Sequence, residues 1–175
     1  MRIALAGLAL LACALAQVSG AAADPYREQR IKTAFLVNFA AFVTWPPGTF
    51  ANADSPIELC ILANDAFGSV LADLAQHKQV NKRPLRISRV FHVEDMRRCQ
   101  IAYLEDADTA SENLAALAGA HVLTVYEQES TLTNGMIRFY IEDDRVRFEV
   151  NVAAAKRENL DLSSKLLGVA KVVMQ

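Results

Sequence analysis

Apolar residues recur every three or four positions near the start of the chain, which is the spacing of a helix with one buried face. The pattern predicts a helix over residues 26–45, which Pro46 and Pro47 end. Its aromatic side chains are expected to lie largely buried against a sheet. The predicted face consists of Ile31, Ala34, Phe35, Asn38, Phe39, Phe42 and Trp45.

Compact apolar runs between turn-forming residues predict buried strands further along the chain. The predicted strands are residues 57–63, 85–90, 101–104 and 121–125. The predicted helices are residues 67–76 and 109–118, with a helical turn over 94–98 and a chain turn over 81–84. Strands that alternate with helices at this spacing predict an α/β fold with a substantial parallel part in its sheet.

Residues 135–151 alternate strictly between apolar and polar, which predicts an antiparallel hairpin. With Asp143 and Asp144 as a two-residue turn, Phe139 meets Phe148 on the inner face. On the outer face, Tyr140 falls opposite Arg147 and Arg138 opposite Glu149, so we expect the second pair to interact at an exposed rim. The whole outer face consists of Met136, Arg138, Tyr140, Arg147 and Glu149.

A last helix is expected after the hairpin, with Ser163 and Ser164 as caps. Its apolar residues are Leu166, Leu167, Val169, Ala170 and Val173. The predicted fold class is therefore α/β, with a mixed sheet, helices on both faces, and a C-terminal antiparallel hairpin followed by helices. No repeat or linker divides residues 24–175, so one domain is expected there.

Residues 1–23 have the pattern of a cleavable export signal. Arg2 precedes an apolar stretch that is shorter than the ~20 residues needed to span a bilayer, and Ala21 and Ala23 form the small-residue pattern that signal peptidase accepts. We therefore predict cleavage after Ala23 and a protein that works outside the cytoplasm. A lipobox ending at Cys13 is the alternative, and the continuation of the apolar tract to Val18 argues against it.

The charge of the chain excludes some classes of partner. The formal net charge is −2, and it becomes −3 when Arg2 leaves with the signal. The charges are scattered, without the basic stripe that nucleic acid or anionic lipid requires. No nucleic-acid partner is therefore expected.

Two cysteines remain after removal of the signal, Cys60 and Cys99. Two thiols in an oxidising compartment usually pair, which favours a disulfide. Two separate buried thiols are the alternative, because cysteine packs well as a small hydrophobe. Neither cysteine has the spacing or the flanking histidine of a redox or nucleophilic site.

Motifs for catalysis or cofactor binding are not found in the sequence. It has no glycine-rich phosphate loop, and its histidines, His77, His92 and His121, lack the spacing of a helical zinc pair. Ser163 and Ser164 next to Lys165 match no known nucleophile motif, and helix capping explains them better. We therefore expect a binding protein without a cofactor or metal, and not an enzyme.

Stretches spread over the mature chain form a joint pattern, beginning with KTAFLVNFA and FVTWP at residues 32–40 and 42–46. The others are residues 59–62, 64–68, 98–101, 121–125, 135–137, 146–151 and 162–167. In order and spacing, this pattern resembles the YfiR family of periplasmic regulators. Cys60 and Cys99 fall where one cysteine pair of the family falls, whereas a second pair has no counterpart around residues 134–141.

The resemblance implies a periplasmic protein, often dimeric, that binds the periplasmic sensor domain of an inner-membrane diguanylate cyclase and holds the enzyme inactive. Cyclic di-GMP and biofilm formation would then fall. Release through an outer-membrane lipoprotein, or through altered redox folding, would raise them again.

Two functions are left open by the sequence. In the first, the protein represses the cyclase, and the partner-binding residues are Tyr140, Arg138, Arg147 and Glu149, because an aromatic among arginines on an open sheet face is typical of protein interfaces. A merely solvated face is the alternative for these charges. In the second function, the protein binds a small ligand or assists another envelope signalling or transport system, with a pocket at the strand ends after Ala63 and Leu104.

Overall fold

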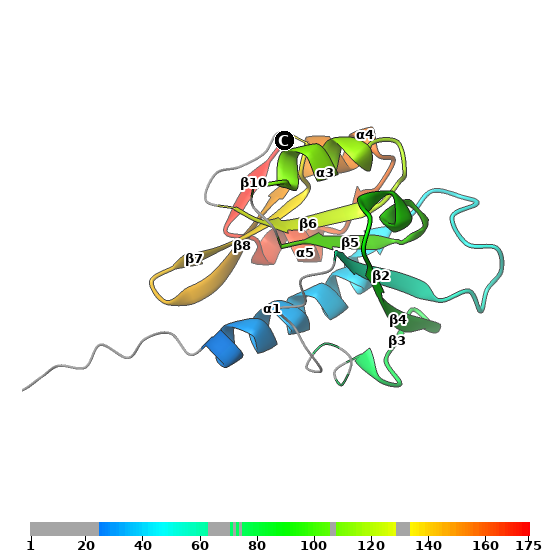
Figure 1. Ribbon diagram of the computed structural model, residues 1–175, viewed down its shortest axis with the longest axis horizontal. Helices are drawn as coiled ribbons and strands as arrows, with labels where there is room; N and C mark the ends of the chain where they lie inside the picture. The colour runs from blue at the N-terminus through cyan, green and yellow to red at the C-terminus, as the bar shows by residue number, and fades with distance from the viewer. Residues whose placement is uncertain (1–24, 63–70, 72, 74, 106–107, 129–133) are drawn as a thin grey trace, which may run out of the picture.

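The computed structural model describes residues 25–62, 71, 73, 75–105, 108–128 and 134–175. In this part of the chain an eight-stranded sheet has the order β10-β8-β7-β6-β5-β2-β4-β3 (Figure 1). Its strands are β2 (Ile57–Leu62), β3 (Gln79–Val80), β4 (Arg83–Val90), β5 (Ile101–Leu104), β6 (Leu123–Glu127), β7 (Ile137–Glu142), β8 (Arg145–Asn151) and β10 (Val172–Met174).

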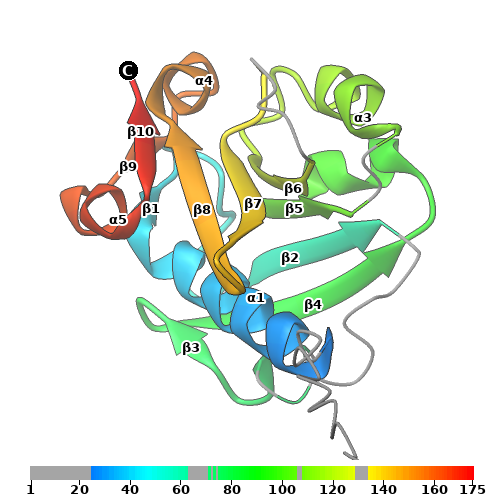
Figure 2. The ribbon, with the colours of Figure 1, turned by 90° about the vertical axis from the view of Figure 1, so that its left-hand side faces the viewer.

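The central strands, from β4 through β2, β5 and β6 to β7, are parallel neighbours, whereas β3–β4 and β7–β8 pair antiparallel. Helix α1 (Pro25–Phe39) lies across one face of this sheet (Figure 2). Helix α3 (Ala110–Ala116) and the 3-10 helix η2 (Val93–Arg98) pack on the other face. The mixed sheet, the helices on both faces and the C-terminal hairpin confirm the predicted fold class.

The first predicted helix is too long. Helix α1 ends at Phe39, the 3-10 helix η1 covers Ala40–Phe42, and a two-residue strand β1 (Val43–Thr44) follows. Strand β1 pairs antiparallel with β9 (Asp161–Leu162), far away in the sequence. Two β-branched residues and the restriction that Pro46 places on Trp45 favour this extended backbone.

The buried face of α1 is also rotated from the predicted one, because Ala34 and Asn38 are exposed. The buried side chains of the helix and its 3-10 extension are Lys32, Thr33, Leu36, Val37, Phe39 and Ala40. Phe39 is only 1% exposed, as predicted, whereas Phe35, Phe42 and Trp45 pack against the core while partly exposed.

The hairpin has the predicted register, with Phe139 opposite Phe148. Asp143 and Asp144 have φ of 50° and 55°, which is the left-handed conformation that a two-residue type I′ turn needs at both positions. Aspartate tolerates this conformation better than most residues do. The local pattern was therefore sufficient to predict this part of the fold.

The last predicted helix is wrong at its C-terminal end. Helix α5 (Ser164–Val169) starts as expected, with the Ser163 side chain accepting a hydrogen bond from the Leu166 amide at 3.4 Å. Ala170 is extended, and Val173 lies in strand β10, which pairs in parallel with β8. Strand β10 provides hydrogen-bond partners for the backbone groups at the free edge of β8. This long-range pairing outweighs the helical pattern of the segment.

Smaller differences concern element boundaries. Strand β6 starts at Leu123 because His121 has φ of 55°, and β4 starts at Arg83 because only Asn81 and Lys82 form the turn before it. The predicted helical turn is the 3-10 helix η2. Of the predicted helix 67–76, the described residues Leu71, Asp73 and Ala75 are helical, whereas Gln76 already lies in a turn.

Candidate partner-binding surface

The outer face of the hairpin, turned away from α1, carries the four predicted partner-binding residues. The structure adds Val172, which lies beside Glu149 on the neighbouring strand β10 and is 44% exposed. Sequence reasoning missed Val172 because its segment was expected to be helical. We call Arg138, Tyr140, Arg147, Glu149 and Val172 the hairpin surface.

Arg138 and Glu149 form a bidentate ion pair at the base of this surface. The Arg138 Nε and Nη2 atoms donate to the Glu149 carboxylate at 2.7 and 2.9 Å, and Nη1 donates to the Gln128 carbonyl at 2.9 Å. The hydrogen bonds with Glu149 raise the pKa of Arg138. The side chains are only 11% and 7% exposed, so the expectation of an exposed rim pair is wrong. Met136, also predicted on the outer face, is 2% exposed.

Tyr140 is held in place by Arg138, whose guanidinium lies 4.7 Å from the centre of the Tyr140 ring. Burial, together with the charges of Glu142 and Glu149, raises the pKa of Tyr140 above its usual value. The phenol therefore keeps its proton at neutral pH and can donate a hydrogen bond to a partner. A stacked aromatic ring loses little entropy on binding.

Arg147 has a weaker attachment than Arg138. Its Nε is 3.7 Å from the Glu142 carboxylate, which lies closer to the Lys171 ammonium, at 3.0 Å. The Nε atom is buried and finds no hydrogen-bond partner among the described residues, although 35% of the side chain is exposed. The exposed part of the guanidinium can donate hydrogen bonds to a carboxylate of a partner.

Cys60 and Cys99 are joined in a disulfide that the sequence analysis favoured over two separate thiols. Their Cα atoms are 6.1 Å apart, and the residues are 0% and 3% exposed. The bond ties the end of η2 to strand β2 within the apolar cluster that contains Met96 and Leu114. The bond lies away from the hairpin surface and inside this core.

Replacing Cys60 by serine should lower the free energy of unfolding by about 2–4 kcal/mol, because the loop it closes spans 39 residues in sequence. Urea denaturation of the variant and the parent measures the difference. Intact mass under denaturing, non-reducing conditions should show no free thiol in the parent, and two reactive thiols would contradict the bond.

A second buried ion pair was not predicted. The Lys32 ammonium on α1 lies 2.5 Å from carboxylate oxygens of Glu28 and of Glu127, and the Tyr103 hydroxyl donates to Glu127. Burial by itself lowers the pKa of Lys32, but the hydrogen bonds and charges of Glu127 and Glu28 outweigh it and raise that pKa. Burial also raises the pKa of Tyr103. These contacts attach α1 to the ends of β5 and β6.

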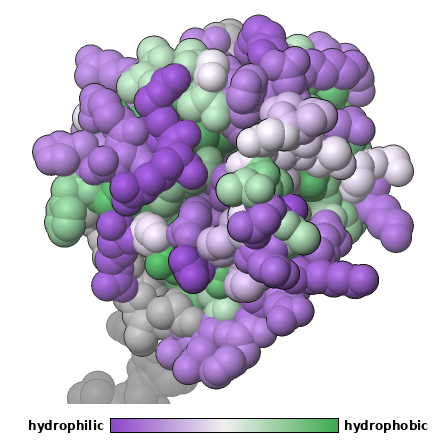
Figure 3. Space-filling model, turned by 90° about the vertical axis from the view of Figure 1, so that its right-hand side faces the viewer, coloured by the Kyte–Doolittle hydropathy of each residue, from purple (hydrophilic) through white to green (hydrophobic). Residues whose placement is uncertain are grey.

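Within the described ranges, no three histidine, cysteine, aspartate or glutamate residues come together as metal ligands, and no helix is long and apolar enough to cross a membrane. The side of the molecule opposite the hairpin tip presents mostly hydrophilic side chains, with its apolar ones in small separate groups (Figure 3).

Comparison with known proteins agrees with the sequence pattern. The sequence model of a family described as YfiR/HmsC-like matches residues 29–171. A search of curated proteins gave no match. Among solved structures, a conserved domain protein from Vibrio cholerae O1 biovar El Tor is similar, with a TM-score of 0.50 and 9% sequence identity. The match covers 82% of this chain and 60% of that one, so it supports the fold alone.

Proposed function

The chain belongs to the YfiR/HmsC-like family of periplasmic regulators, and we propose that it represses an inner-membrane diguanylate cyclase by binding that enzyme's periplasmic sensor domain. Membership indicates a regulatory protein rather than a catalytic one. Bound to the sensor domain, the protein would keep the cyclase inactive, lowering cyclic di-GMP and biofilm formation. An outer-membrane lipoprotein that competes for the protein would reverse this, and a homodimer would present the surface twice.

The observation that carries the proposed site is the partly exposed position of Arg147 opposite Tyr140. Arg147 has 35% of its side chain exposed, and the neighbouring strand β10 exposes Val172. Arginine and tyrosine are the residues most often found as binding hot spots, and an adjacent apolar side chain excludes water from them. The buried Arg138–Glu149 pair fixes the ring of Tyr140 beneath the partner.

Replacing Tyr140 by alanine should raise cyclic di-GMP toward the level of cells that lack the protein. Loss of a hot-spot aromatic weakens binding by about 2 kcal/mol, roughly thirtyfold in the dissociation constant. Arg147→Ala should act in the same direction. The readout is cyclic di-GMP in cells that make each variant at the normal level, after thermal unfolding has shown that the variant is folded.

Tyr26→Ala is the matched control, because Tyr26 is 55% exposed on α1, outside the hairpin surface. It should repress like the parent. Full repression by both Tyr140→Ala and Arg147→Ala would place the cyclase interface elsewhere, on the helical faces.

The second function, a small-ligand or accessory protein of another envelope system, stays a prediction. The pocket it requires would follow Ala63, which lies outside the described residues, and Leu104, which ends β5. Capture of the tagged mature protein from envelope extract separates the two functions. A retained membrane protein with a diguanylate cyclase domain supports repression, and a retained transporter or sensor kinase supports the accessory function.

A further inference from the structure

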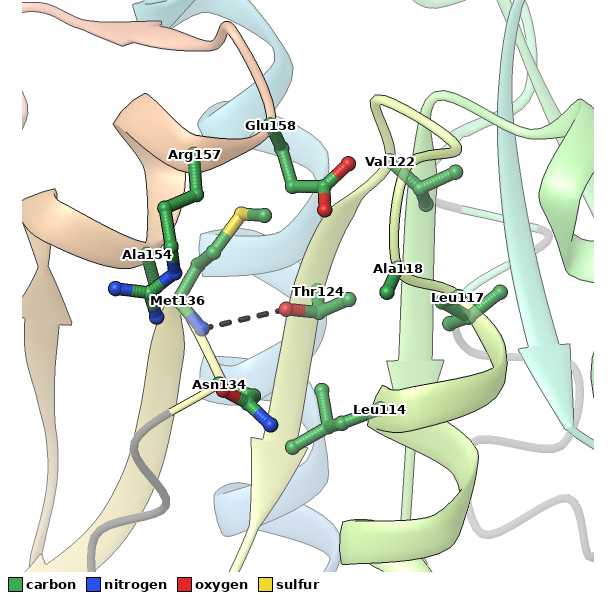
Figure 4. A pocket seen from close by; sticks show the side chains of 10 residues that line it. All are labelled: Leu114, Leu117, Ala118, Val122, Thr124, Asn134, Met136, Ala154, Arg157 and Glu158. Atoms are coloured by element: carbon green, nitrogen blue, oxygen red, sulfur yellow. Dashed lines mark hydrogen bonds between the residues drawn. The ribbon is translucent and has the colours of Figure 1, made fainter.

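A pocket of about 180 Å³ lies between α3 and α4 (Val152–Arg157), above the first residues of β6 and β7 (Figure 4). It is distinct from the hairpin surface and from the strand ends after Ala63 and Leu104. Its apolar walls are Leu114, Leu117, Val122, Met136 and Ala154, each 4% exposed or less. On the α4 side, Ala154 contributes only a short side chain, and a larger one there would fill the space.

The end of the pocket is held by Glu158. Its carboxylate accepts hydrogen bonds from the backbone amides of Gly119 at 2.8 Å and His121 at 3.0 Å, so both oxygens are engaged. The His121 ring also contacts the Glu158 carbonyl at 2.8 Å. These bonds join the loop after α3 to the end of α4, at one end of the pocket.

The other polar groups that face the pocket can each donate a hydrogen bond. Thr124 is 4% exposed, and its hydroxyl oxygen accepts from the Met136 amide at 3.2 Å, while its own proton meets no acceptor among the described residues. The Asn134 amide points into the space, and the Arg157 side chain runs along the α4 wall toward Asn134 (Figure 4). A buried hydroxyl donor, an amide and a guanidinium around an apolar floor suit a ligand with one anionic acceptor group.

We propose that this pocket binds a small organic acid, with its apolar part between Leu117, Met136 and Ala154 and its carboxylate toward Thr124, Asn134 and Arg157. An apolar protein cavity of about 150 Å³ holds a benzene molecule, so the pocket takes a single ring or a chain of similar volume. The proposal does not depend on cyclase binding.

The test is a titration of the mature, disulfide-bonded protein with benzoate, followed by two-dimensional NMR, with benzyl alcohol as the neutral probe. Benzoate should bind saturably and shift the amide signals of residues 114–118 and 134–136. Arg157→Gln should weaken benzoate about tenfold, because it removes a charge-assisted hydrogen bond, and should leave benzyl alcohol within about twofold. Lys156→Gln makes the same charge change one residue away and should leave both affinities unchanged.

Ala154→Leu tests the apolar part, since the longer side chain fills the pocket and should abolish binding of both probes. If this variant does not fold, the comparison of Arg157→Gln with Lys156→Gln still decides the matter. Absence of saturable binding to the parent would overturn the proposal. Equal weakening by Arg157→Gln and Lys156→Gln would also overturn it, because benzoate would then respond only to overall charge.

Discussion

Replacing Glu149 by alanine is expected to lower the free energy of unfolding by about 3–5 kcal/mol. The reason is the position of Arg138, whose side chain is 11% exposed and keeps its charge because the Glu149 hydrogen bonds raise its pKa. Without the carboxylate, the buried guanidinium would lose its two charge-assisted hydrogen bonds to Glu149, while the bond to the Gln128 carbonyl would remain. Urea denaturation at neutral pH, followed by circular dichroism, measures the change.

Two control variants separate this cause from a general effect of losing a charge. Replacing both partners, Arg138→Met with Glu149→Leu, removes the buried charges together and should cost much less than Glu149→Ala alone. Arg86 forms an ion pair with Glu58 at 3.7 Å, and its side chain is 68% exposed. Arg86→Ala removes this exposed pair and should change the free energy of unfolding by less than about 1 kcal/mol. If Glu149→Ala behaves like Arg86→Ala, the Arg138–Glu149 pair is solvated and Arg138 is not fixed beneath Tyr140.

The register of the hairpin could be predicted from the sequence, whereas the burial of two of its side chains could not. The register of β7 and β8 depends on side-chain alternation and on two aspartates that tolerate left-handed backbone, and all of this information is local. The burial of Arg138 and Glu149 depends on segments far away in the sequence. An alternating charged residue is usually solvated, so the pattern alone predicted an exposed rim.

The same distinction applies to the ends of the helices. Val43 and Val173 continue helical patterns, and only their pairing with β9 and β8 makes them strands. For the same reason, the sequence did not predict that Val172 is part of the hairpin surface. The disulfide was favoured on different grounds, since export to an oxidising compartment makes two remaining cysteines pair whatever their local pattern. The ion pair between Lys32 and Glu127 could be predicted only by knowing which strand α1 crosses. The predicted buried face of the helix was rotated from the real one, so it did not supply this information.

The second prediction with a large expected effect concerns the packing of α1 against the sheet. Phe39→Ala should lower the free energy of unfolding by about 3–5 kcal/mol, because the side chain is 1% exposed and truncation leaves a cavity. Its ring centre is 5.2 Å from that of Phe148 and 5.8 Å from that of Phe139, so the hairpin would lose part of its inner-face packing. Alanine has a high helix propensity, so the loss arises from packing and not from the helix itself. Urea denaturation gives the value.

Phe91→Ala provides the matched control for this prediction, since the same atoms are removed from a residue that is 78% exposed. It should change stability by less than about 0.5 kcal/mol, as surface substitutions usually do. Cyclic di-GMP measured for the Phe39 variant, at a temperature where it is still folded, adds a functional test. The hairpin surface faces away from α1, so the folded fraction should still repress. A near-neutral effect of Phe39→Ala on stability, together with loss of repression, would mean that α1 is a docking surface and not the cover of the sheet.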